Sequence, residues 1–134
     1  MQTENQDVRW KQRFSNFERT ITLLERTLQI ENLSEVERAG LIQFYEMSFE
    51  LAWKLMKDYL EEEGLTVKSP RQAIKQAFQS ELLADGQVWM DALGDRNLTA
   101  HTYNESIALQ VVAQIRTRYA PALHQLYKVM KAKI

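Results

Sequence analysis

The sequence predicts an all-α protein, an antiparallel up-and-down bundle of four main helices and one short helix. Three observations lead to this prediction. The 134 residues include only four glycines and two prolines, so the chain has few breaks. Apolar residues recur at steps of three and four, and the alternation typical of strands is sustained nowhere. The length fits one domain, which we assign to residues 1–134.

The first two predicted helices are long. The first runs from about residue 5 to 29, because six apolar residues follow one another at helical steps: Trp10, Phe14, Phe17, Ile21, Leu24 and Leu28. Ser34 and Glu37 have the spacing of a capping box, which opens a second helix over residues 35–63. That helix is apolar around much of its girth, so we expect it to lie at the centre. Gly64 ends it.

The remaining helices follow from their breaks. Ser69 and Pro70 predict the start of a short third helix. Asp85-Gly86 begins a fourth segment that contains Trp89. The last predicted helix runs from about residue 104 to 131, and Pro121 should kink it by removing one backbone hydrogen bond.

Composition and charge exclude several classes of protein. The absence of cysteine excludes disulfides, thiolate catalysis and cysteine-based metal sites. No apolar run is long enough to span a bilayer, and the polar N-terminus lacks a secretory signal, so we expect a cytoplasmic protein. The net charge of −1 creates no overall attraction for nucleic acid. Residues 31–63 are strongly acidic and residues 104–134 are basic, so these segments either pair within the fold or face different partners.

Residues 95–105 form a polar run between two apolar helical segments, so their polar groups need partners in the fold or in a ligand. On an ideal helix Arg96 and His101 would point about 140° apart. They would converge on one substrate only if the helix ends between them or if a second copy of the chain supplies one of them. A two-fold dimer would bring two such pairs around one axis.

The residue types in this run suit phosphodiester cleavage in RNA. A neutral His101 can take the proton of a 2′-hydroxyl, and Arg96 can stabilise the charge that builds on the phosphoryl oxygens. Asn97 would orient either group. This route needs no metal and no cofactor, and no second histidine or carboxylate pair stands at metal-ligand spacing. A helix end whose polar groups bond to one another explains the same residues, and spacing alone favours this second explanation.

Two stretches resemble a known family. Arg96-Asn97, three residues, His101, one residue and Tyr103 resembles the Arg-x4-His-x-Tyr motif of the HEPN superfamily. The resemblance is strongest to its HepT-like proteins, also named nucleotidyltransferase substrate-binding proteins. Residues 45–54 resemble that family's second-helix signature, Phe-Glu-Leu-Ala-Trp-Lys. The Ser69-Pro70-Arg71 helix start and the segment around Trp89 occur in the expected order, so the resemblance covers nearly the whole chain.

The resemblance implies a homodimeric helical bundle with the motif near the dimer interface. Active members are metal-independent ribonuclease toxins, which makes Arg96 and His101 the expected catalytic pair. Their partner is a minimal nucleotidyltransferase antitoxin that transfers AMP to the motif tyrosine, here Tyr103. Phosphate added beside Arg96 would neutralise the anion site. The expected function is therefore the toxin of a type VII-like toxin–antitoxin pair.

Two other functions stay open. The same family resemblance fits a non-catalytic substrate-binding subunit of a two-chain nucleotidyltransferase, and a structural dimerisation module is the third candidate. If RNA binds, the basic last helix offers candidate contacts, unless they form a solvated face: Arg116, Arg118 and Lys128. Glu46 and Glu50 lie one turn apart on the second helix, where we expect them to pair with Arg96 or with Lys54.

Overall fold

The structure, a computed structural model, describes residues 2–134, with side chains from Val8 onward. These residues form helices and turns and contain no strand, which confirms the all-α prediction. The α-helices are α1 (Gln2–Leu28), α2 (Glu35–Glu62), α3 (Pro70–Gln79), α4 (Gly86–Gly94), α5 (Glu105–Gln114) and α6 (Ala120–Lys131). A 3₁₀ segment, Asp95–His101, joins α4 to α5, and a π-helical segment, Ile115–Tyr119, joins α5 to α6.

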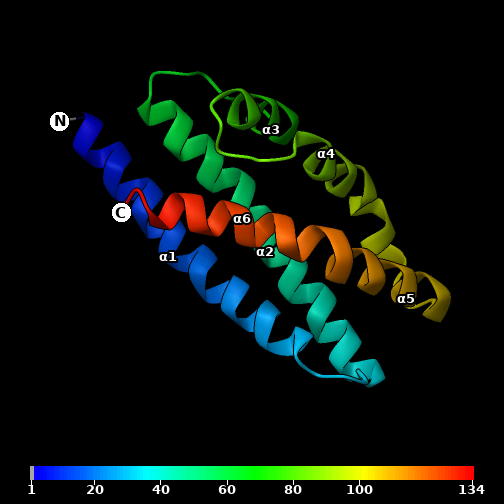
Figure 1. Cartoon of the computed structure of the whole chain (residues 1–134). Coiled ribbons are helices and arrows are strands. Elements are labelled where there is room, and N and C mark those ends of the chain that lie inside the picture. The colour runs from blue at the N-terminus through cyan, green and yellow to red at the C-terminus, as the bar shows by residue number, and fades with distance from the viewer. Residues whose placement is uncertain (1) are drawn as a thin grey trace.

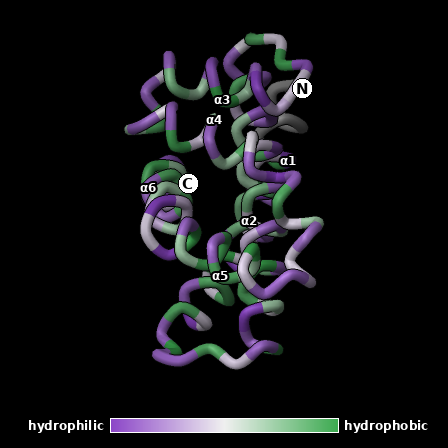
Figure 2. The backbone as a smooth tube through the Cα atoms, turned by 90° about the vertical axis from the view of Figure 1, so that its right-hand side faces the viewer, coloured by the Kyte–Doolittle hydropathy of each residue, from purple (hydrophilic) through white to green (hydrophobic). Residues whose placement is uncertain are grey.

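Helix α2 is the centre of the bundle, as its broad apolar surface predicts. It runs antiparallel to α1 along most of its length and also contacts α3, α5 and α6 (Figure 1). Helices α3 and α4 cover one side of α2, and α6 returns between that layer and α1 (Figure 1). Helix α6 also contacts α1 and α2. In the side view, the helices carry both hydrophobic and hydrophilic residues (Figure 2).

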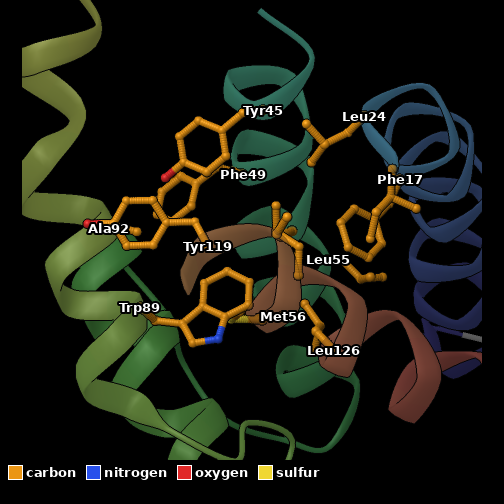
Figure 3. Packing of buried hydrophobic residues seen from close by; sticks show 14 of the residues in the cluster. Phe17, Leu24, Tyr45, Phe49, Leu55, Met56, Trp89, Ala92, Tyr119 and Leu126 are labelled. Carbon is orange, nitrogen blue, oxygen red and sulfur yellow. The ribbon is translucent and has the colours of Figure 1, made fainter. Parts of the chain in front are cut away.

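The core is built from the apolar stripes that the sequence predicts. Five of the six residues in the α1 stripe are buried, and Leu28 at its end is partly buried. Phe17 and Leu24 from α1 point toward Leu55 of α2 and Leu126 of α6 (Figure 3). The aromatic residues are mostly core: among those with two per cent or less of their surface exposed are Trp10, Phe17 and Trp89.

The helix ends follow the expected chemistry. The Ser34 hydroxyl accepts a hydrogen bond from the Glu37 N–H (3.1 Å), and the Glu37 carboxylate accepts one from the Ser34 N–H (2.8 Å). This capping box opens α2. Gly64 follows α2 with a φ of +94°, a backbone region that favours glycine. Ser69 caps α3 by accepting a hydrogen bond from the Gln72 N–H (3.1 Å).

The last helix departs from the prediction of one kinked helix over residues 104–131. Asn104 is the N-cap of α5, and five residues, Ile115–Tyr119, take the wider π conformation immediately before Pro121. Proline has no N–H to donate, and its ring crowds the carbonyl four residues earlier. The wider π turn relieves this crowding: the Ala120 N–H donates to the Ile115 carbonyl, five residues back.

Candidate functional site

The polar run is not part of an α-helix. Helix α4 ends at Gly94, and the next seven residues form the tighter 3₁₀ segment. Short polar side chains compete with the helical backbone for hydrogen bonds. The Thr99 hydroxyl donates to the Arg96 carbonyl (2.7 Å), and the Thr102 hydroxyl donates to the Thr99 carbonyl (3.2 Å). Asn104 then caps α5 by accepting from two backbone N–H groups. Part of the polarity of this run therefore serves local hydrogen bonding.

Arg96 and His101 do not meet within one chain. A 3₁₀ helix turns about 120° per residue, so residues five apart still point in different directions. Arg96 reaches the side of α2, whereas His101 is exposed and its ring lies edge-on to the Tyr103 ring, with 6.0 Å between centroids. The prediction of α-helical geometry is thus wrong for this segment, but the prediction that Arg96 and His101 point in different directions holds.

Arg96 is bonded to the second-helix signature. Its Nη2 donates to Oε1 of Glu50 at 2.5 Å, and its Cζ lies 6.0 Å from the centre of the Phe49 ring. The other oxygen of Glu50 accepts from the Trp53 indole N–H (2.9 Å) and lies 3.9 Å from the Lys54 ammonium. The expectation that Glu46 and Glu50 pair with Arg96 or with Lys54 is confirmed for Glu50, which contacts both partners, and not for Glu46, whose carboxyl lies near the Thr99 hydroxyl.

A surface pocket of about 340 Å³ lies beside Arg96. Burial raises the pKa of the Glu46 carboxyl above its usual value, and the nearby Thr99 hydroxyl partly opposes this shift. His101 does not line this pocket, whereas Asn97 does. The pocket's lining residues are Tyr45, Glu46, Phe49, Glu50, Arg96, Asn97 and Thr99.

Two contacts from the π segment hold the start of the motif. The Tyr119 hydroxyl donates to the Asp95 carboxylate, and Arg118 Nη2 lies 2.5 Å from an oxygen of Asp91. The Arg118 guanidinium lowers the pKa of the Asp91 carboxyl. Tyr119 also stacks on Tyr45 of α2, with 5.7 Å between ring centroids, inside the aromatic cluster of Figure 3.

Sequence reasoning missed Asp91, Asp95 and Tyr119 as supports of the motif. Their periodicity places Asp91 and Asp95 on polar helix positions and Tyr119 on the core face. The available signal was Pro121, because a proline inside a helical pattern marks a place where the helix changes register. That change turns Arg118 and Tyr119 toward the end of α4.

The other end of the motif is open to solvent. Tyr103 is 86% exposed, and it borders a second surface pocket of about 450 Å³ between the start of α2 and the start of α5. Arg38 of α2 lies in this pocket, 3.6 Å from a carboxylate oxygen of Glu105. An enzyme that modifies tyrosine hydroxyls would therefore reach Tyr103 without local unfolding.

The three candidate RNA-contact residues of the last helix differ in their surroundings. Arg116 donates from Nη1 to the Leu28 carbonyl at the end of α1 (2.9 Å), and Arg118 is engaged with Asp91. Lys128 is exposed on α6. Two further contacts of this basic region reach α1: a hydrogen bond between His124 and Glu25, and an ion pair between Lys131 and Glu18. Where the chain is described, these partners therefore come from α1 and α4 rather than from the acidic residues 31–63.

Two further properties concern metals and membranes. Among the described side chains, no three histidine, aspartate or glutamate residues come close enough together to hold a metal ion. None of the described helices combines the length and the apolar character needed to cross a membrane.

Comparison with known proteins gives consistent results. Residues 12–132 match the family model described as nucleotidyltransferase substrate binding protein like. A Haemophilus influenzae protein named "Probable ribonuclease HepT" is 32% identical over 82 residues, which cover 58% of this chain and 56% of that protein. The match thus spans about half the length of this relative.

Two solved structures share the fold. A Thermus thermophilus protein is 35% identical, with a TM-score of 0.74 over 82% of this chain and 94% of that chain. A second neighbour, from Haemophilus influenzae, is described as revealing the fold of a substrate binding domain of a nucleotidyltransferase. It is 23% identical, with a TM-score of 0.68 over 94% of this chain and 98% of that chain, and it supports the fold alone.

Proposed function

The chain belongs to the family of HepT-like, nucleotidyltransferase substrate-binding proteins, and we propose that it is the metal-independent ribonuclease toxin of a type VII-like toxin–antitoxin pair. The observation that supports this proposal most is the arrangement of residues 95–103. Arg96 is held in place by polar contacts, and His101 and Tyr103 stand exposed a few residues further on. The similarity to a relative named as a ribonuclease adds to this support.

The proposed reaction is transfer of the RNA phosphate to the neighbouring ribose. Neutral His101 takes the 2′-hydroxyl proton, the 2′-oxygen bonds to phosphorus, and the bond from phosphorus to the 5′-oxygen breaks. The leaving oxygen takes up a proton, so the products are a 2′,3′-cyclic phosphate and a 5′-hydroxyl. Arg96 stabilises the charge that develops on the phosphoryl oxygens, and Asn97 orients the phosphate.

This chemistry needs a second copy of the chain. His101 does not line the pocket beside Arg96, so one chain brings only part of a phosphodiester site to that pocket. A homodimer with two-fold symmetry places the Arg96 of one protomer near the His101 of its partner and creates two equivalent sites. Size measurement of the purified protein by light scattering checks this: we expect twice the 15.8 kDa chain mass, and a monomer with ribonuclease activity would contradict it.

Control of the toxin is proposed to act at Tyr103. A minimal nucleotidyltransferase partner transfers AMP from ATP to the exposed hydroxyl of this residue: the hydroxyl gives up its proton, its oxygen bonds to the α-phosphorus, and pyrophosphate leaves. The new phosphodiester carries a negative charge next to the His101 ring and competes with RNA for the cationic site. We place the pair in the cytoplasm, where RNA and ATP are both present.

The runner-up is a non-catalytic substrate-binding subunit of a two-chain nucleotidyltransferase. The description of the matching family model, nucleotidyltransferase substrate binding protein like, favours it, as does the contact between Arg96 and Glu50, which gives Arg96 a partner without any substrate. Both functions predict the same enzyme as partner. They differ in whether His101 takes part in chemistry.

Induced expression without the partner tests the proposal. We expect growth arrest by the wild type and normal growth with His101→Ala. The matched control is His124→Ala. His124 bonds Glu25 of α1 and no residue of the motif, so this variant should still arrest growth. Normal growth with the wild type, or arrest by the His101 variant, would favour the substrate-binding subunit.

The modification has its own test. The purified protein is incubated with the partner and ATP, and its mass is measured before and after digestion. Wild type and Tyr45→Phe should both gain AMP, since Tyr45 is buried, whereas Tyr103→Phe should gain none. A gain of mass on another residue would overturn the assignment of Tyr103.

A further inference from the structure

The second-helix signature has no part in the proposed reaction, yet four of its side chains gather at Arg96. Glu50 bonds Arg96 directly, Phe49 lies beneath the guanidinium, and Trp53 and Lys54 contact the Glu50 carboxylate. Glu50 and Arg96 lie 46 residues apart in the sequence, and the two motifs meet at the Arg96 side chain. This contact gives the signature a physical purpose within the site.

The Glu50 carboxylate is itself fixed. Its Oε2 accepts from the Trp53 indole at 2.9 Å, and the Lys54 ammonium is 3.9 Å away. Trp53 is partly buried and packs against the core, so its N–H has a defined position. All three residues are on α2, the most extensively packed helix. An ordinary surface ion pair loses side-chain entropy and gains little, whereas a carboxylate held by two further donors presents its other oxygen in a set direction.

The contact uses only part of the guanidinium. Arg96 donates to Glu50 from Nη2, and a guanidinium carries five N–H donors in a planar fork. The Arg96 side chain is 45% exposed, so donors remain accessible from the solvent. Arg96 can therefore bind a phosphate while it is bonded to Glu50.

We propose that Glu50 is the positioning residue for Arg96 in phosphodiester cleavage, an inference that rests on the proposed ribonuclease function. Glu50 does not touch the RNA. It orients the guanidinium before the substrate arrives, because donors stabilise a transition state best when they need no reorganisation. Loss of Glu50 therefore lowers kcat more than it raises KM. If the Glu50 carboxylate instead competed with the RNA phosphate for Arg96, its removal would speed the reaction.

Kinetics on a short single-stranded RNA of mixed sequence tests the proposal. For Glu50→Gln we expect kcat to fall by about 10- to 100-fold, as for a misplaced catalytic group, while KM stays within about 3-fold. The matched control is Glu61→Gln on the same helix, whose carboxylate pairs with Lys57 and Arg9 away from the motif and whose loss should leave both constants unchanged. A Glu50 variant as fast as the wild type or faster would overturn the proposal.

A double-mutant cycle separates positioning from a general structural role. If Glu50 acts through Arg96, Glu50→Gln adds no further loss in an Arg96→Ala background. An additive loss would show that Glu50 acts independently of Arg96 and would contradict the proposal. If Glu50→Gln fails to fold, Trp53→Phe removes the indole N–H that Glu50 accepts, together with part of the ring's packing, and we expect a fall in kcat of about 3-fold for it, as for a small loss of orientation.

One readout does not depend on activity. NMR of the arginine side chains reports how fast each guanidinium rotates. In the wild type the rotation of Arg96 should be slow, and in Glu50→Gln it should become fast, with Arg118 as an internal reference because it stays bonded to Asp91. Equal rotation in both proteins would overturn the positioning role. A wild type that cuts no RNA but shows slow Arg96 rotation would instead refute the proposed ribonuclease.

Discussion

The α1–α2 hairpin and the segment from α4 to the π turn are held together in different ways. The hairpin is joined mainly by apolar residues that repeat at helical steps, and a partly buried ion pair between Arg13 and Asp58 adds to them. The segment between Asp91 and Tyr119 changes between α, 3₁₀ and π conformation and is tied to the bundle by polar contacts from Arg96, Arg118 and Tyr119. Apolar periodicity thus builds the frame, and polar contacts place the site on it.

The largest expected effect is on the frame. Phe17 is fully buried, and Phe17→Ala should lower the free energy of unfolding by about 3–5 kcal/mol through lost burial and a new cavity. Urea denaturation followed by circular dichroism measures this change. A loss below about 1 kcal/mol would mean that the hairpin does not depend on its apolar stripe in the way that its burial indicates.

A smaller effect is expected where the π segment supports the motif. Tyr119→Phe removes the hydroxyl that bonds Asp95 and should cost about 1–2 kcal/mol, because a carboxylate loses its donor. The same variant should reduce ribonuclease activity, since Asp95 directly precedes Arg96. Unchanged activity together with reduced stability would show that the contact between Tyr119 and Asp95 stabilises the fold but does not position Arg96.

A smaller loss of stability is expected at the N-cap of α2, in the α1–α2 hairpin. Ser34→Ala removes the oxygen that caps α2 and should cost about 1 kcal/mol. Because the Ser34 side chain bonds within its own capping box and does not line the pocket beside Arg96, activity should persist at temperatures below the new midpoint. The control is Ser34→Asn, which retains a capping side chain and should restore most of the lost stability.

How much the sequence reveals differs between the two regions for the same reason. The helices of the frame could be predicted almost to their bounds, because local signals mark them: the apolar stripe from Trp10 to Leu28, the Ser34 cap and Gly64. The contact between Arg96 and Glu50 was among the expected pairs, because few partners exist for a carboxylate on an apolar helix. The 3₁₀ and π segments could not be predicted, since they depend on contacts such as Tyr119 with Asp95 that no local pattern encodes.

The smallest expected effect concerns pH. The pKa of Glu46 is higher in the folded chain than its ordinary value of 4.5, so the folded state binds this proton more tightly than the unfolded state. Its contribution to stability is therefore full below pH 4.5 and is lost as the pH rises through the folded pKa. The free energy of unfolding should therefore fall with rising pH because of Glu46, and Glu46→Gln should remove this part of the pH dependence. Denaturation at about pH 4 and about pH 7 measures it, and an equal slope in wild type and variant would show that Glu46 has no raised pKa.

The central claim is that residues 95–103 cut RNA without a metal, and direct cleavage tests it most closely. Purified wild type, His101→Ala and His124→Ala are incubated with labelled single-stranded RNA, with and without EDTA. We predict cleavage by the wild type and by His124→Ala that EDTA does not affect, a 2′,3′-cyclic phosphate at the new end, and no cleavage by His101→Ala. Cleavage that disappears with EDTA, or that survives in a folded His101→Ala protein, would contradict the account.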